Sequence, residues 1–104
     1  MKDITIIVPI HKYDEQIEEM LTNALKSLPS KTKVILSCAS NIYSSLENKI
    51  NNYIKVISID GTSFQELVNN GVDSVDTKWF SILEFDDEYT PIWFNEVEKY
   101  IEYN

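Results

Sequence analysis

The feature that most constrains the fold is an alternation of two hydrophobic patterns, repeated four times along the chain. Short β-branched or aromatic runs are typical of strands, and apolar residues that recur every three or four positions are typical of amphipathic helices. Strands that alternate with helices form parallel sheets, so the pattern predicts an α/β fold with helices on both sheet faces. The predicted strands are Asp3–Pro9, Lys33–Cys38, Lys55–Ile59 and Trp79–Phe85.

Each predicted strand is followed by a helix with a recognisable start. Asp14 is placed to cap the first helix, Ser40 or Asn41 the second, and Ser63 opens a capping box with Glu66. Thr90 with Pro91 is typical of a further helix start, over residues 91–103. The side chains expected to face the core are Ile17, Met20, Leu21, Ala24, Leu25, Leu28, Ile42, Leu46, Ile50, Phe64, Leu67, Val68, Val72 and Val75.

Length and charge narrow the function classes. We expect the 104 residues to form one domain, 1–104, without a membrane span and in the cytoplasm. A net charge of −8 disfavours nucleic acid as a partner. All nine basic residues are lysines, so any anionic ligand must be held by Lys, backbone N–H groups or a metal. One cysteine, Cys38, and one histidine, His11, exclude a disulfide and a Cys/His zinc site within the chain.

The loops exclude several nucleotide-binding families. Neither of the two glycines follows the first strand, so the Gly-rich dinucleotide loop and the P-loop are absent there. The same position holds no phosphorylatable carboxylate, because it reads Pro9–Lys12. The helix after it begins with Asp14 and Glu15, whose charges would repel a phosphate at that helix N-terminus.

An acidic cluster after the fourth predicted strand is the main candidate for chemistry. Side chains alternate along a strand, so Glu84 and Asp86 are expected to project the same way, with Asp87 at the following turn. Carboxylates at a strand's carboxyl end suit Mg²⁺ or Mn²⁺. A structural interpretation remains open, in which Asp87 or Thr90 caps the next helix and Glu88 is solvated.

Other polar residues near the expected strand ends allow two interpretations. His11 could stack on a base or contact a phosphate, or it could be an ordinary loop histidine. Lys12 could pair with a pyrophosphate or remain solvated, and Asn69 could lie near the site or simply near the end of a helix. Cys38 fits a buried small hydrophobe better than a nucleophile, because no general base is near it in sequence.

Three segments, in order, resemble the first half of a family-two glycosyltransferase of the GT-A fold. Ile7–Lys12 resembles the opening V-P-x-Y-N segment, with His11 and Lys12 in the last two positions. Asn69–Val72 resembles an N-x-G-I segment, and Trp79–Pro91 resembles Y-I-x-F-L-D-x-D-D…P. The resemblance places the family's D-x-D motif on Glu84-Phe85-Asp86 and spans nearly the whole chain.

The resemblance implies a site for a nucleotide-diphospho-sugar. Glu84, Asp86 and Asp87 would hold Mn²⁺ or Mg²⁺ against the two phosphates. The family's nucleotide pocket would fall on Pro9, Ile10, His11, Lys12, Cys38 and Asn69.

Several positions depart from the family pattern, among them Glu84, a Glu at the first acidic position of D-x-D. The segment Cys38–Asn41 replaces the usual Asp-Asp-Gly-Ser, and Val68 replaces a common Arg. Moreover, the family's second half, which supplies the acceptor site and the general base, has no counterpart in the 104 residues.

The overall prediction is a three-layer α/β/α domain with a mainly parallel four-stranded sheet in the order 3-2-1-4, GT-A/Rossmann-like and truncated. If active, it is a metal-dependent glycosyltransferase that moves a hexosyl-type sugar and is completed by a second chain or second copy. The alternative is a catalytically inactive relative that acts as a protein-interaction or weak nucleotide-binding module.

Overall fold

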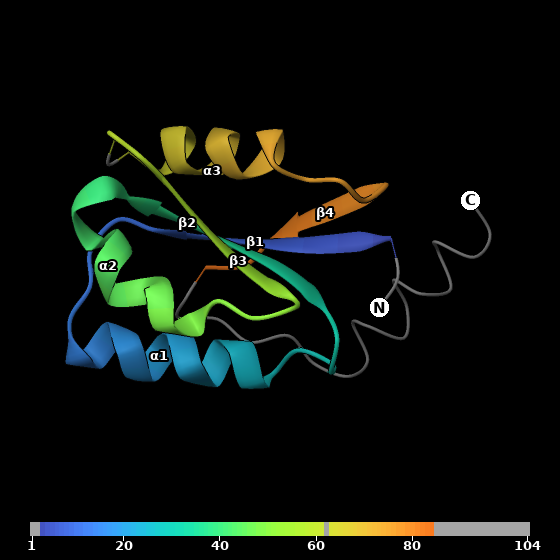
Figure 1. The fold of residues 1–104 in the computed structure, drawn as a ribbon, viewed down its shortest axis with the longest axis horizontal. Coiled ribbons are helices and arrows are strands. Elements are labelled where there is room, and N and C mark those ends of the chain that lie inside the picture. Colours follow the sequence, from blue (N-terminus) through green and yellow to red (C-terminus); the bar gives the residue numbers. More distant parts are fainter. Residues whose placement is uncertain (1–2, 62, 85–104) are drawn as a thin grey trace.

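The structure, a computed structural model, describes residues 3–61 and 63–84 of the chain. Four strands alternate with three helices along these residues (Figure 1). Two single 3₁₀ turns, η1 (Ser40–Ile42) and η2 (Glu47–Lys49), flank the second helix. In chain order the strands and helices are β1 (Ile4–Ile10), α1 (Glu15–Lys26), β2 (Lys33–Ala39), α2 (Tyr43–Leu46), β3 (Ile54–Ile59), α3 (Phe64–Asp73) and β4 (Trp79–Ile82).

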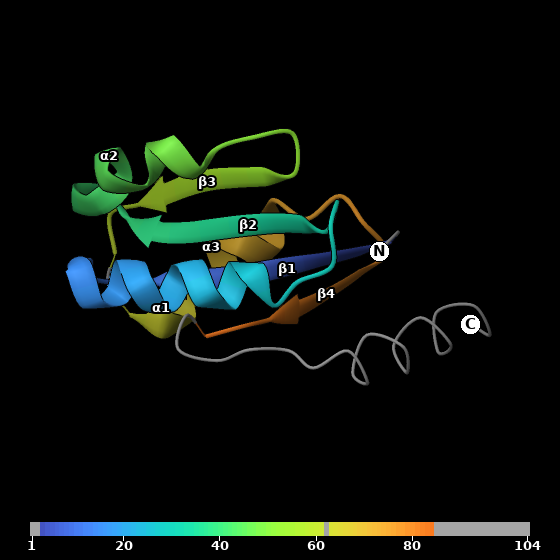
Figure 2. The same cartoon turned by 90° about the horizontal axis from the view of Figure 1, so that it is seen from below.

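The strands form one parallel sheet in the order β3-β2-β1-β4, which confirms the predicted α/β class and strand order. Helices α1 and α2 cover one face of the sheet and α3 covers the other, so the arrangement has three layers and is Rossmann-like (Figures 1 and 2). The chain enters at β1, adds β2 and β3 on one side, and then crosses to place β4 on the other side of β1. The sheet order therefore reverses between β1 and β4.

Side chains of the central strands point alternately to the two faces of the sheet, so they pack into two separate layers of the core. Even-numbered residues of β1 and β2, such as Ile6 and Leu36, belong to the cluster that includes Leu21 and Ala24 of α1. Odd-numbered residues face α3, as Ile7 does. All seven residues of β1 are buried because β1 lies between two strands and beneath helices on both faces. A continuous apolar run is what such a strand requires.

The predicted helix starts are confirmed for α1 and α3. Asp14 Oδ1 accepts a hydrogen bond from the Ile17 amide at 2.8 Å, and Ser63 Oγ accepts one from the Glu66 amide at 3.1 Å. The Glu66 carboxylate accepts the Ser63 hydroxyl at 2.8 Å. Each cap satisfies an amide that the first helical turn would leave unpaired.

The inner face of α3 differs from the predicted one. Leu67, Val68 and Gly71 are its buried residues, whereas Phe64 is 53 % exposed at the first position of the helix. Ser37, which is fully buried on β2, donates its hydroxyl to the Leu67 carbonyl at 2.6 Å. Gly71 faces β1, so the helix lies close to the sheet at a position where a side chain would collide with Ile7.

The second predicted helix is shorter than expected. Only α2, four residues long, is α-helical, and η2 ends at Lys49. Ile50 was predicted to face the core, but it is extended and 48 % exposed. No side-chain hydrogen bond caps η1, α2 or η2, so local capping does not stabilise a longer helix here.

Strand β4 also ends early, at Ile82 rather than Phe85, and it is not covered on both faces. Phe80 and Ile82 pair in register with Thr5 and Ile7 and therefore face the α3 side. They are 47 % and 38 % exposed because α3 packs mainly over β1, β2 and β3. The predicted helix at 91–103 and residue Phe85 lie outside the described residues. None of the helices in the described part is long and apolar enough to cross a membrane.

Candidate functional site

Because all four strands are parallel, their carboxyl ends meet at one edge of the sheet, which we call the carboxyl edge. The residues that follow the strands there are His11, Ser40, Asp60 and Leu83. In open α/β sheets ligands bind at this edge, where the strand order reverses. Here the reversal lies between β1 and β4, so the loops after Ile10 and Ile82 flank the expected binding position.

The predicted residues at the end of β1 divide into two pairs. The side chains of Pro9 and Ile10 are buried in the sheet. His11 and Lys12 are exposed in the loop of residues 11–14 before α1, which we call the His11 loop. Asp14 then caps α1, and Glu15 lies in the helix's first turn. Of the predicted residues in this segment, His11 and Lys12 are therefore the two exposed to solvent at the carboxyl edge. They precede the carboxylates of Asp14 and Glu15.

Pro9 also limits the hydrogen bonding between β1 and β4, because it lacks a backbone N–H group. Leu83 N donates to Ile7 O at 2.9 Å, and the odd-numbered residues of β1 are the ones that bond to β4. The next bond of a parallel ladder would run from the amide of residue 9 to the Leu83 carbonyl, which proline cannot supply. The β1–β4 ladder therefore stops where the strand was predicted to continue.

Glu84 follows the last ladder bond and is exposed at the carboxyl edge. The register pairs Ile7 with Ile82, so by the same offset Glu84 is level with Pro9, two residues before His11. At about 3.3 Å per strand residue this corresponds to roughly 7 Å along the strand direction. The structure thus brings Glu84 and the His11 loop to neighbouring strand ends, whereas Asp86 and Asp87 lie outside the described residues.

The end of β2 presents a buried thiol. Cys38 is fully buried and its Sγ donates to the Ile57 carbonyl at 3.4 Å. Burial raises the pKa of the Cys38 thiol, because desolvation disfavours the thiolate. A protonated thiol in the core agrees with the interpretation of Cys38 as a small hydrophobe.

Ser40 and Asp60 form a polar pair that sequence reasoning missed. Ser40, directly after β2, donates its hydroxyl to Asp60 Oδ1 at 2.6 Å, and Asp60 directly follows β3. Both side chains are exposed. The pair places a carboxylate beside the end of β2, where the segment Cys38–Asn41 has none. The sequence signal is Asp60 itself, a carboxylate directly after the third predicted strand, Lys55–Ile59.

Asn69 is not brought to this edge. It lies on the exposed side of α3, opposite the buried Leu67 and Gly71, and its Oδ1 accepts a hydrogen bond from Gln65 Nε2 at 3.0 Å. It is five residues beyond Phe64, the first residue of the helix, or about 7.5 Å along the helix axis. The structure therefore separates Asn69 from the His11 loop and from the Ser40–Asp60 pair.

A network beside the His11 loop fixes α1 to η2. Glu18 accepts hydrogen bonds from the Tyr13 hydroxyl, from Lys49 Nζ at 2.7 Å and from the Thr22 hydroxyl at 3.3 Å. Burial alone would raise the pKa of Glu18, but the hydrogen bonds from Lys49 and Tyr13 and the Lys49 charge outweigh it and lower that pKa. Burial and the Glu18 carboxylate raise the pKa of Tyr13 to about 12.

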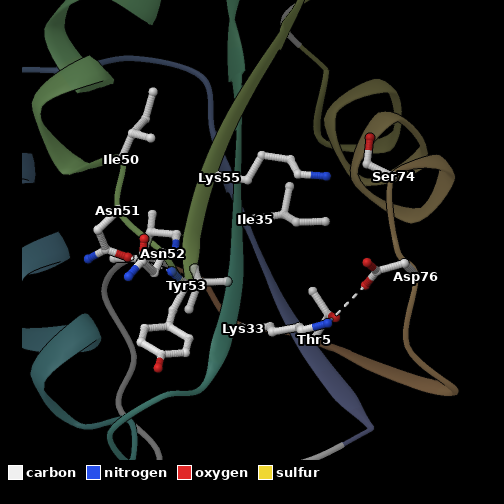
Figure 3. A pocket seen from close by; sticks show the side chains of 12 residues that line it. Thr5, Lys33, Ile35, Ile50, Asn51, Asn52, Tyr53, Lys55, Ser74 and Asp76 are labelled. Atoms are coloured by element: carbon white, nitrogen blue, oxygen red, sulfur yellow. Dashed lines mark hydrogen bonds and ion pairs between the residues drawn. The ribbon is translucent and has the colours of Figure 1, made fainter.

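The described part of the carboxyl edge does not itself form a metal centre. Within residues 3–61 and 63–84, no group of three or more His, Cys, Asp or Glu side chains is arranged to hold a metal ion. Glu84 is the one predicted metal ligand that the structure describes, and an exposed carboxylate after β4 fits the donor type that Mg²⁺ or Mn²⁺ takes. A cavity of about 360 Å³ lies at the opposite edge, away from these residues (Figure 3).

In comparisons with known proteins, no family model, no curated protein and no solved structure matched this chain. The Rossmann-like fold, the geometry of the carboxyl edge and the sequence motifs are therefore the basis for the functional proposal.

Proposed function

We propose that the domain formed by residues 1–104 binds a nucleotide-diphospho-sugar at the carboxyl edge, through a divalent metal ion held by Glu84, Asp86 and Asp87. The observation that carries the proposal is the reversal of strand order between β1 and β4, which sets the His11 loop and Glu84 at adjacent strand ends. This is where α/β sheets of this kind accommodate ligands. The resemblance of Trp79–Pro91 to a glycosyltransferase metal motif supplies the ligand class.

The charges at this edge support a metal-dependent mode of binding. The carboxylates of Asp14, Asp60 and Glu84 lie at or beside strand ends. In the His11 loop, the positively charged side chain is that of Lys12. Two phosphates would be repelled by these carboxylates. A divalent cation reverses the sign of the local field and would stabilise charge on a departing nucleoside diphosphate.

The protein's own residues would have distinct roles in this proposal. His11 would stack on the base or donate to a phosphate, and Lys12 would pair with the pyrophosphate. The Asp60 carboxylate, oriented by Ser40, would accept hydrogen bonds from the nucleoside. No residue of the described part is assigned as the general base for an acceptor hydroxyl, and in this proposal a second chain or a second copy would supply it.

Thermal unfolding with Mn²⁺ and a panel of nucleoside diphosphates and nucleotide-sugars tests the proposal. A ligand at 100 times its dissociation constant stabilises the folded state by about 2.7 kcal/mol, which raises the melting temperature of a small domain by several degrees. We expect this shift to need the metal and the nucleotide together. A panel that leaves the melting temperature unchanged would contradict the proposal.

Two variants locate the metal ligands in the same assay. Glu84→Gln and Asp86→Asn should each remove the metal-dependent part of the shift. Asp73→Asn is the matched control, because it makes the same charge change on an exposed residue at the far end of α3. A shift without metal that survives both variants would instead support the weak nucleotide-binding module.

A further inference from the structure

Lysines are concentrated at the edge opposite the proposed site, where the strands begin; we call this the amino edge. Two cavities adjoin there, of about 360 and 450 Å³, and they share Lys33, Tyr53 and Asp76 in their linings. Four of the chain's nine lysines line them, against the two carboxylates of Asp3 and Asp76. In a chain of net charge −8, this edge is locally cationic. The four lysines are Lys31, Lys33, Lys55 and Lys78.

Two of these lysines lie on the same face of the sheet. Ile35 of β2 pairs with Lys55 of β3, and Lys33 precedes Ile35 by two residues, so Lys33 and Lys55 both face the α3 side. Strand spacing and rise place their Cα atoms about 8 Å apart. Figure 3 shows both side chains directed toward the segment that holds Ser74 and Asp76. One small anion can therefore contact both ammonium groups.

The positive charge at this edge is only partly compensated. Lys33 pairs with Asp76 at 3.4 Å, and both side chains are more than half exposed, at 52 % and 75 %. An exposed pair of this length contributes little and exchanges readily with another partner. The Lys55 ammonium makes no ion pair or hydrogen bond within residues 3–61 and 63–84, although it lies beside Lys33.

Neutral polar groups complete the lining of the first cavity. Asn51 Oδ1 accepts hydrogen bonds from the amides of Tyr53 and Ile54, each at 2.8 Å, so its side-chain NH₂ group remains as a donor. The Ser74 hydroxyl also lines the cavity, where it donates to the Asn70 carbonyl at 3.3 Å, and Ile35 contributes an apolar wall. A cavity of this volume with a few polar donors is of the size that binds small molecules.

We propose that the amino-edge cavity binds a small anion carrying two phosphates, held by Lys33 and Lys55 without a metal ion. A single carboxylate would neutralise one ammonium group and leave the other repelled by its neighbour. A pyrophosphate group carries enough charge for both, and its oxygens accept hydrogen bonds from the two ammonium groups. This site is separate from the carboxyl edge, because the full length of the strands lies between them.

Titration with sodium pyrophosphate, in the presence of a chelator and at constant ionic strength, tests the proposal by protein NMR. We expect saturable shifts of the backbone amide signals of Lys33, Lys55 and Ser74. Lys55→Met and Lys33→Met should each weaken binding about tenfold, which corresponds to one charge-assisted hydrogen bond. Sulfate at equal ionic strength should bind more weakly, because it is a single tetrahedral anion with less charge and fewer acceptor oxygens than pyrophosphate.

Lys26→Met is the matched control, since it removes the same charge from an exposed position of α1 on the other face of the sheet. It should leave the pyrophosphate affinity unchanged. Equal weakening by Lys26→Met, or shifts that grow linearly without saturation, would overturn the proposal and indicate general charge attraction. Because the chelator removes divalent metal, the result is independent of whether the carboxyl edge binds a nucleotide-sugar.

Discussion

A Cβ atom added at Gly71 would lie 2.6 Å from Cγ2 of Ile7, a separation at which one of the two atoms must move. The contact joins the middle of α3 to the centre of β1, where Ile7 is fully buried. Glycine at this position lets the helix approach the sheet more closely than any other residue would. The pair therefore sets the spacing between α3 and the sheet.

Gly71→Ala should destabilise the protein by up to about 2 kcal/mol, since overpacking costs about 1–3 kcal/mol and the roughly 1 kcal/mol that alanine gains in a helix offsets part of it. Urea unfolding measures the change. Asp73→Ala, an exposed substitution in the same helix, should be neutral or slightly stabilising. Ile7→Leu removes the β-methyl group at similar volume, so the double variant should be more stable than the sum of the single changes predicts. Strict additivity would refute the contact.

Ser37→Ala should lower the free energy of unfolding by about 1 kcal/mol, the typical contribution of one buried hydrogen bond. The variant loses the 2.6 Å bond from Ser37 Oγ to the Leu67 carbonyl. That carbonyl still accepts its helical partner, so no buried acceptor is left unpaired. Ser45→Ala, at an exposed position of α2, is the control and should change stability by less than about 0.5 kcal/mol. Equal effects of the two variants would show that the buried bond contributes nothing.

The Glu18 network should make stability depend on acid pH. The folded-state pKa of Glu18 is lowered, so its contribution is present above its usual value of 4.5 and is lost as the pH falls through the folded-state pKa. Glu18 is partly exposed, so we expect a contribution of about 0.5–1 kcal/mol. Unfolding free energies of the native protein and Glu18→Gln, measured between neutral and acid pH, should converge as the pH falls. Curves that remain parallel would exclude the linkage.

Tyr13 should titrate with a pKa of about 12, above the usual value of 10.0 for tyrosine. Because the pKa is raised on folding, the stability linked to the protonated hydroxyl is fully present below its unfolded value of about 10 and is lost as the pH rises toward 12. The difference in tyrosinate absorbance between the native protein and Tyr13→Phe isolates this group. Glu18→Gln should lower the Tyr13 pKa, because it removes the carboxylate charge. An unchanged titration in Glu18→Gln would assign the shift to burial alone.

Asp60→Asn should weaken nucleoside diphosphate binding at the proposed site about tenfold, because it removes a charged acceptor. Asparagine keeps an oxygen that can accept the Ser40 hydroxyl, so the local structure should remain. Calorimetry with Mn²⁺ present measures the affinity, and Asp73→Asn is again the control of equal charge. An affinity unaffected by Asp60→Asn would remove the Ser40–Asp60 pair from the site.

Features determined by residues close in sequence could be predicted well. The alternation of strands and helices, the Asp14 and Ser63 caps and the parallel sheet were all predicted, because they depend on short-range periodicity and on hydrogen bonds spanning three residues. For the candidate site, the structure gives only the positions of some predicted residues, and their binding role stays a prediction. His11 and Glu84 do follow adjacent strands, whereas Asn69 lies apart from them on the outer side of α3.

Tertiary structure alone decided the remaining features, because each depends on residues far apart in sequence. Strand β4 ends early because Pro9, more than seventy positions before it, offers no N–H to the ladder. The Ser40–Asp60 bond and the closeness of Lys33 to Lys55 follow from the register in which β2 pairs with β3, which the predicted strand order did not specify. The sequence by itself thus determined which elements form and where the chain turns, and the packing of distant strands decided which side chains share an edge.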